Sequence, residues 1–201
     1  MLAPLAAAFL SACDSGPFAG WFGAPKAATF NGIDLTGADY AKTLSLTDHN
    51  GVPRTLADFK GKLVVLFFGF TQCPDICPTS MAELAQAKQM LGKDGDRVQG
   101  VFVTVDPERD TPELLKAYMA NFDPSFLALR GTLDQTKATA KDFKAYYAKV
   151  PGKSPDSYTM DHTAAFYVFD ATGRIRLFVR NDVGPEKLAA DLKQLLASSN
   201  A

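Results

Sequence analysis

The chain has 201 residues, of which 47% are hydrophobic, and this apolar content is enough for one well-packed domain. Its 21 Lys and Arg residues nearly balance 22 Asp and Glu residues, so no nucleic-acid partner is expected from the charge. After the first stretch, no apolar run reaches the roughly 20 residues of a transmembrane helix, and no internal repeat is visible.

The N-terminal segment differs in composition from the rest of the chain. Residues 1–12, MLAPLAAAFLSA, are uncharged and mostly apolar or small, which is typical of the hydrophobic part of a signal peptide. Leu10 to Cys13 resemble the lipobox of bacterial lipoproteins, in which the cysteine becomes the lipidated first residue. No Lys or Arg precedes Lys26, so either translation starts upstream or the match is accidental. We predict a lipoprotein signal peptide over residues 1–13, with Cys13 as the lipidation site.

A flexible tether is predicted over residues 14–39, which begin with a Gly-, Ala- and Pro-rich stretch, and the main domain over residues 40–197. A lipobox would place this domain at the periplasmic face of the bacterial inner membrane. Asp14 agrees with this location, because it resembles the signal that retains some lipoproteins in that membrane. In such an oxidising compartment, Cys73 and Cys77 would remain as an isolated pair.

Strands and helices alternate along the main domain. In chain order, we expect a hairpin around Asn50–Gly51, a buried strand over 61–70, a helix whose first turn holds Pro78, a second buried strand over 97–106, a helix from Thr111–Pro112 through Ala120, a helix from Thr132 to about Ala148, two strands joined by Ala171–Gly173, and a last helix from Pro185. Residues 126–130, FLALR, are too short to assign. This order is typical of a thioredoxin-like (peroxiredoxin-like) α/β sheet flanked by helices, here with an N-terminal hairpin extension.

Cys73 and Cys77 lie in the segment FFGFTQCPDICPTSM, just after the first buried strand. Open α/β sheets place their chemistry at this carboxyl end of the strands. Pro78 lacks an N–H, so we expect the helix to begin near Cys77, where its free N–H groups favour thiolate. The pair suits redox exchange or metal binding. A structural disulfide is disfavoured, because so short a loop would contribute only about 2 kcal/mol.

The chain has two histidines. His49 precedes the Asn50–Gly51 turn and is interpreted as a solvated turn residue. His162 opens the first strand of the closing hairpin in our assignment, and that hairpin lies near the cysteine loop in a thioredoxin-like sheet. The residues before it, 149–161, combine Pro, Gly and Ser and are predicted to form a loop that metal binding orders. Whether His162 is a third ligand stays open at this point.

Three segments resemble successive signatures of the Sco/SenC family. They are 67–84 (FFGFTQCPDICPTSMAEL), 101–122 (VFVTVDPERDTPELLKAYMANF) and 158–176 (YTMDHTAAFYVFDATGRIR). The family consists of thioredoxin-like copper chaperones that assist assembly of the binuclear copper centre of cytochrome c oxidase. The resemblance covers about residues 40–197. It implies that Cys73, Cys77 and His162 are copper ligands.

Two thiolates and one imidazole form a soft ligand set that suits Cu(I), and with a water or a carboxylate it could also hold Cu(II). Structural zinc would require a fourth protein ligand. Asp106, in the family-like VDPERDTP segment, is interpreted as a residue that orders the site without touching the metal, and a solvated cap before Pro107 is the alternative. Met160 is interpreted as a packed or exposed side chain rather than a thioether ligand.

Two functions of different classes follow from the resemblance. A binding protein would hand copper to the copper-centre subunit of cytochrome c oxidase, and another periplasmic copper chaperone is a further expected partner. A thiol–disulfide reductase would use Cys73 and Cys77 as a redox pair to keep that subunit's cysteines reduced. Both require a membrane-tethered thioredoxin-like reductant, because only the reduced pair binds copper. A peroxidase is disfavoured, since peroxiredoxins carry Thr where this chain has Pro74.

The lipobox can be tested by substitution of its cysteine. Cys13→Ser should leave the protein unprocessed and unanchored in its native host, whereas the control Cys73→Ser should remain lipidated. Mass spectrometry of the mature N-terminus measures both. An unmodified N-terminus that begins upstream of Cys13 in the unsubstituted protein would contradict the assignment.

Overall fold

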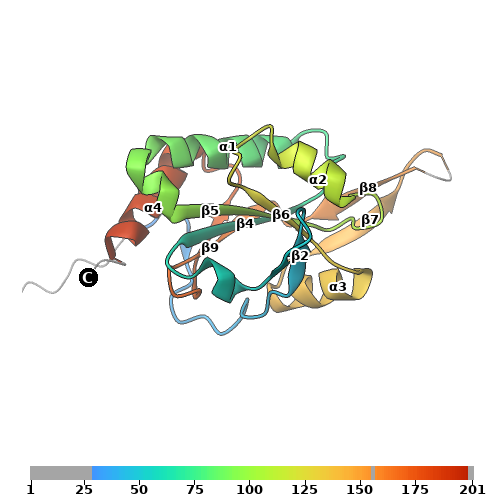
Figure 1. Ribbon diagram of the computed structural model, residues 1–201. Helices are drawn as coiled ribbons and strands as arrows, with labels where there is room; N and C mark the ends of the chain where they lie inside the picture. The colour runs from blue at the N-terminus through green and yellow to red at the C-terminus, as the bar shows by residue number, and fades with distance from the viewer. Residues whose placement is uncertain (1–28, 155–156, 199–201) are drawn as a thin grey trace, which may run out of the picture.

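The computed structural model describes residues 29–154 and 157–198 (Figure 1). The predicted signal peptide and Cys13 lie outside these residues. The strands are β1 (Ile33–Asp34), β2 (Leu46–Asp48), β3 (Pro53–Arg54), β4 (Leu63–Gly69), β5 (Val98–Thr104), β6 (Leu127–Arg130), β7 (Tyr147–Pro151), β8 (Tyr158–His162), β9 (Ala165–Phe169) and β10 (Ile175–Arg180). The helices are α1 (Ile76–Met90), α2 (Pro112–Met119), α3 (Leu133–Asp142) and α4 (Pro185–Ser198), with short 3-10 helices at Leu56–Phe59 and Gly92–Arg97.

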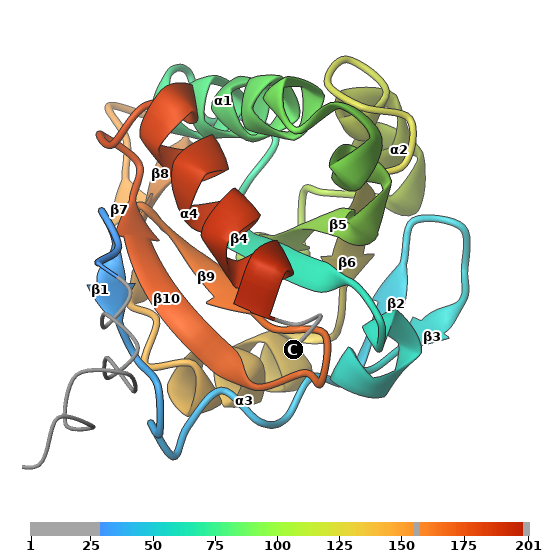
Figure 2. The same cartoon turned by 90° about the vertical axis from the view of Figure 1, so that its left-hand side faces the viewer.

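A mixed sheet forms the centre of the fold, with strand order β1-β10-β9-β4-β5-β6-β2-β3. Strands β4, β5 and β6 run parallel, and β9 and β10 continue the sheet in antiparallel pairs. Every residue of β4 and β5 is buried, as their continuous apolar sequences predict for strands covered on both faces. Helices α1, α2 and α4 cover one face and α3 covers the other (Figure 2).

The starts of two helices follow from capping residues that the sequence shows. The Thr111 side chain accepts a hydrogen bond from the Leu114 N–H, and Pro112 occupies the first turn of α2. Thr132 and Gln135 form a reciprocal capping box at the start of α3. Both predicted starts are therefore confirmed. Among the described residues, no helix has both the length and the apolar content needed to cross a bilayer.

The region after α3 differs from the sequence prediction. The helix expected from Thr132 to about Ala148 ends at Asp142, because Lys144 takes a left-handed conformation with φ of 52° that a helix cannot continue. The segment 149–161, predicted as a loop, mostly belongs to the hairpin of β7 and β8. His162 ends β8 rather than opening the strand of the closing hairpin, and residues 127–130 form β6.

The described fold includes residues before position 40. Strand β1 pairs with β10, and the buried carboxylate of Asp191 in α4 accepts hydrogen bonds from the Asn31 and Gly32 N–H groups at 2.9 and 2.8 Å. Most of the segment predicted as a tether, 14–39, lies outside the described residues. Its described end is held by β10 and α4. The predicted hairpin at Asn50–Gly51 is present as β2 and β3, and it joins the main sheet at its edge beside β6.

Candidate metal centre

The two cysteines lie where β4 ends and α1 begins. The Cys73 N–H donates to the Phe70 carbonyl in the loop after β4, and Cys77 is the second residue of α1. The helix begins at Ile76 with Asp75 as its N-cap, slightly earlier than expected. Pro78 falls in the first turn, where its missing N–H leaves no helical hydrogen bond unmade. The Cys77 N–H is one of the free donors at this helix end, and it points at the Cys73 Sγ at 3.4 Å.

The thiol of Cys77 is fully buried, and Gly69 makes room for it. A Cβ atom at position 69 would lie 2.8 Å from the Cys77 Sγ and 2.7 Å from a ring carbon of Phe102. Real side chains do not approach that closely, so any residue other than glycine would displace the sulfur or the ring. The last residue of β4 therefore sets the position of the second cysteine.

The imidazole of His162 reaches the pair from β8. Its Nε2 lies 3.3 Å from the Cys77 Sγ, and its Nδ1 lies 3.2 Å from the Thr163 carbonyl oxygen. The carbonyl can only accept, so it assigns the proton to Nδ1 and leaves Nε2 with a lone pair for a metal. The rings of Phe67 and Phe70 meet the imidazole edge-on at centroid distances of 5.7 and 6.0 Å, which fixes its orientation.

The ligand atoms of Cys73, Cys77 and His162 all lie within 4.8 Å of one another. Within the described parts of the chain, this is the one such group of three Cys, His, Asp or Glu residues. An open cavity of about 220 Å³ lies between the cysteine loop and β8 and reaches both Cys73 and His162. Because no fourth Cys, His, Asp or Glu joins this group among the described residues, the donor set fits a three-coordinate soft metal better than structural zinc.

The side chains of Cys73 and Cys77 differ in charge. A hydrogen bond from the Cys77 thiol is the largest cause that lowers the pKa of Cys73 to about 3, and the backbone N–H groups of Asp75 and Cys77 add to it. The same hydrogen bond raises the pKa of Cys77, and burial raises it further. Half-buried Cys73 is therefore the thiolate, and buried Cys77 remains a neutral thiol until a metal or a base takes its proton.

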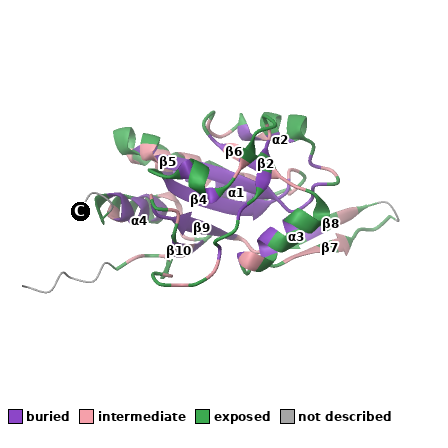
Figure 3. Cartoon of the chain, turned by 60° about the horizontal axis from the view of Figure 1, so that its bottom comes forward, coloured by how far each residue is buried: buried purple, intermediate pink, exposed green. Residues whose placement is uncertain are grey.

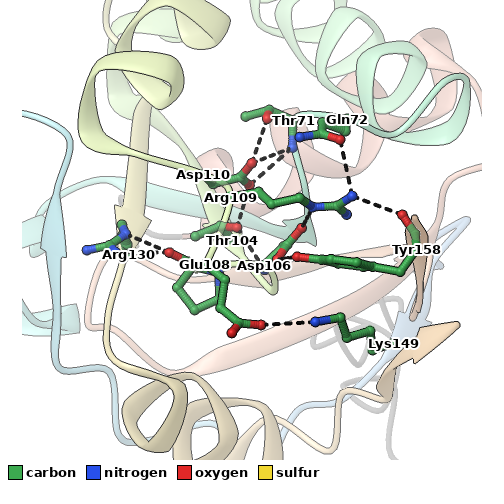
Figure 4. Close-up of polar contacts among 11 residues, drawn as sticks. Thr71, Gln72, Thr104, Asp106, Glu108, Arg109, Asp110, Arg130, Lys149 and Tyr158 are labelled. Atoms are coloured by element: carbon green, nitrogen blue, oxygen red, sulfur yellow. Dashed lines mark hydrogen bonds and ion pairs between the residues drawn. The ribbon is translucent and has the colours of Figure 1, made fainter. Parts of the chain in front are cut away.

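Asp106 lies in the segment after β5 and does not belong to the group of ligand atoms. Its side chain is buried, accepts a hydrogen bond from the Tyr158 hydroxyl at 2.9 Å, and forms an ion pair with Arg109 (Figure 4). The alternative of a solvated cap is therefore wrong. Both carboxylate oxygens have partners, which agrees with a residue that orders the surrounding loops.

Sequence reasoning missed Asp110, which supports the start of the cysteine loop. This fully buried carboxylate accepts hydrogen bonds from the N–H and hydroxyl of Thr71 and from the Thr104 hydroxyl, the last two at 2.5 Å (Figure 4). Burial raises the pKa of Asp110 despite these donors. The sequence did offer one signal for Asp110. It is the second Asp, after Asp106, in the segment that follows the carboxyl end of β5, next to the end of β4.

Two other sequence interpretations have clear outcomes. Met160 is packed, with 8% of its surface exposed, and it lines the same cavity as Cys73 and His162. His49 is more than a solvated turn residue. Its backbone N–H donates to the Ala128 carbonyl, and its ring Nδ1 accepts from the Ala128 backbone N–H at 3.1 Å. Burial lowers the pKa of His49, which keeps the ring neutral for this acceptor role.

Comparisons with known proteins agree with this geometry. The family model of SCO1/SenC matches residues 34–197. A SCO2-like protein of Rickettsia felis is 39% identical over 149 residues, which is 74% of this chain and 73% of the relative. The copper-bound structure of Bradyrhizobium japonicum ScoI is 43% identical, with a TM-score of 0.70, over 76% of this chain and 97% of that one.

A third solved structure is that of a SCO1/SenC family lipoprotein from Bacillus anthracis. It is 30% identical, with a TM-score of 0.66, over 77% of this chain and 93% of that one. These likenesses confirm the resemblance given by the three sequence segments. They also confirm the expected fold class, a thioredoxin-like sheet flanked by helices.

The charge difference between the thiols can be tested by alkylation. A lowered pKa means that the Cys73 thiolate is complete above that pKa and is lost only as the pH falls through it. The rate of Cys73 alkylation by iodoacetamide should therefore change little between about pH 5 and pH 8. Cys77→Ala lacks the main hydrogen-bond donor, so the pKa of Cys73 should be higher in this variant. The rise of its alkylation rate with pH should therefore begin at a higher pH than in the unsubstituted protein. Mass spectrometry of the Cys73 peptide measures both. A rise of about tenfold per pH unit in the unsubstituted protein, as for an ordinary thiol of pKa about 8.5, would contradict the assignment.

Proposed function

Because the chain belongs to the SCO1/SenC family, we propose that it is a copper chaperone that carries one copper ion on Cys73, Cys77 and His162. Copper is the cargo of such a protein rather than a resident cofactor. The observation that carries the proposal is the convergence of two sulfurs and an imidazole nitrogen from two separate segments. The copper-bound Bradyrhizobium relative adds support, because it shares the fold and is 43% identical over 76% of this chain.

The donor set favours Cu(I). Thiolates are soft, and neutral imidazole completes a three-coordinate set without adding charge. Cys73 is already a thiolate, whereas Cys77 must release its proton as copper binds, so binding weakens as the pH falls. A water or a carboxylate as a fourth ligand would extend the same site to Cu(II).

The proposed acceptor is the copper-centre subunit of cytochrome c oxidase, since the Sco family consists of cytochrome c oxidase assembly proteins. A three-coordinate ion beside an open cavity has room for an incoming thiolate, so copper can pass by exchange of one ligand at a time. We further propose two upstream partners. A periplasmic copper chaperone would load the site, and a membrane-tethered thioredoxin-like protein would keep the two thiols reduced.

A second candidate function is reduction of the acceptor's disulfide, and the unequal thiols favour it. The Cys73 thiolate would attack one sulfur of that disulfide, form a mixed disulfide and release the other sulfur as a thiolate. Cys77 would then lose its proton and attack Cys73, which frees the second acceptor thiol and leaves a Cys73–Cys77 disulfide. The reductant would return two electrons and one proton, which restores the Cys73 thiolate and the Cys77 thiol.

We propose that the protein is anchored by a lipid on Cys13 at the periplasmic face of the inner membrane. The lipobox-like segment supports this location, as does the Bacillus anthracis relative that is described as a lipoprotein. An anchor there would hold the copper site close to a membrane-embedded oxidase.

Substitution of the histidine separates the two functions. His162→Ala should weaken Cu(I) binding by more than the roughly 10–100-fold that a supporting residue contributes, because it removes a ligand. Reduction of a model disulfide should be largely unchanged, since it needs only the two cysteines. His49→Ala is the matched control and should bind copper normally. Competition with a chromophoric Cu(I) chelator measures the affinity.

Two further outcomes decide between the candidates. Stoichiometric copper on the Cys73→Ser/Cys77→Ser protein would refute the metal site. In cells that lack the native protein, failure of His162→Ala to support oxidase assembly would favour copper delivery. Full assembly with that variant would favour the reductase.

A further inference from the structure

The third ligand of the site belongs to a hairpin that is separate from the main sheet. Strands β7 and β8 form their own two-stranded sheet, so the hydrogen-bond ladder of the central strands does not hold them. Of their ten residues only Met160 is buried, while β4, β5 and β9 are buried throughout (Figure 3). Apolar packing therefore gives this hairpin little stability of its own.

At its His162 end, the hairpin is held to the rest of the domain by aromatic rings, because Phe67 and Phe70 contact the imidazole at centroid distances of 5.7 and 6.0 Å. The backbone bond from the Thr163 N–H to the Tyr146 carbonyl only extends the ladder of the hairpin itself. A hairpin that is attached only at this end could rotate about it. The other end of β8, at Tyr158, lies about 13 Å away at the usual rise of a strand. A second attachment there would fix the direction of β8.

Such an attachment exists at Tyr158. The Arg109 guanidinium carbon lies 3.5 Å from the ring centroid of Tyr158, and the Lys149 Nζ lies 3.8 Å from it, so two cations contact the aromatic ring. The Tyr158 hydroxyl donates to the Asp106 carboxylate at 2.9 Å. Burial and this hydrogen bond raise the pKa of Tyr158 to about 12, so the hydroxyl remains a donor.

Arg109 connects this end of the hairpin to two other segments. Its guanidinium pairs with Asp106, donates to the Tyr158 carbonyl at 2.9 Å, and donates to the Gln72 side chain at 3.1 Å (Figure 4). Gln72 directly precedes Cys73. One planar cation thus joins β8, the segment after β5 and the cysteine loop, and a lysine could not make this set of directed bonds.

We propose that Asp106, Arg109 and Tyr158 form a clamp that positions His162 against the two sulfurs and thereby sets the metal affinity of the site. The inference rests on the proposed copper-binding function. The three clamp residues are positioning residues, because none of them belongs to the ligand group. Residues that orient metal ligands in this way commonly change metal affinity by about 10–100-fold.

Tyr158→Phe tests the clamp with little change of shape, because it removes only the hydroxyl that bonds Asp106. Its Cu(I) affinity, measured by chelator competition, should fall about tenfold. Arg109→Gln should lower the Cu(I) affinity by a larger factor, because it removes the cation and its hydrogen bonds to the Tyr158 carbonyl and the Gln72 side chain. Tyr146→Phe is the matched control: Tyr146 is 63% exposed just before β7, and its substitution should change nothing. In the apo protein, amide hydrogen exchange over residues 158–162 should be faster in Tyr158→Phe.

The decisive comparison repeats Tyr158→Phe in the His162→Ala protein. If the clamp acts through His162, it should cause no further loss of copper affinity there. An equal loss in both backgrounds, or no loss in either, would overturn the clamp while the metal site stands. If His162→Ala alone bound copper as tightly as the parent, the proposed site would be refuted, and the inference with it. If Arg109→Gln fails to fold, Tyr158→Phe alone decides the question.

Discussion

The metal centre depends on the hydrogen bonds that Cys77 directs at the Cys73 sulfur from the first turn of α1. Its N–H is a free donor of the helix end and lies 3.4 Å from that sulfur, and the thiol of Cys77 is the main cause that lowers the pKa of Cys73. A glycine at the end of β4 lets the thiol sit deep enough to do this. The result is a thiolate beside a neutral thiol, held in place before any metal or substrate arrives, so little reorganisation is needed for either proposed reaction.

The histidine reaches this pair by a different physical route. Tight packing places Cys77, but His162 is carried by a marginal hairpin that polar contacts hold at one end and aromatic rings hold at the other. A ligand on such an element can leave without disturbing the core. A copper carrier needs to bind its cargo tightly and still release it, and a rigid pair of sulfurs with a separately mounted imidazole suits both needs.

The sequence allowed the core of the fold and the cysteine position to be predicted, because both depend on local signals. Apolar runs predicted β4 and β5, and Thr111 and Pro112 predicted the start of α2. The hairpin of β7 and β8 was missed, since its short strands are partly polar and its anchors lie about 40 to 50 residues earlier in the chain. Asp110 was missed for a similar reason, because its hydrogen-bond partner Thr71 is distant in sequence. The ligand role of His162 came from the resemblance, not from its position on a strand.

The central claim is that one copper ion bridges the cysteine loop and the hairpin. X-ray absorption spectroscopy of the reduced protein loaded with one equivalent of Cu(I) tests it directly. The account predicts two sulfur ligands and one imidazole nitrogen around copper, with the imidazole signal absent in His162→Ala. Coordination by two sulfurs alone in the unsubstituted protein, or an imidazole signal that persists without His162, would contradict it.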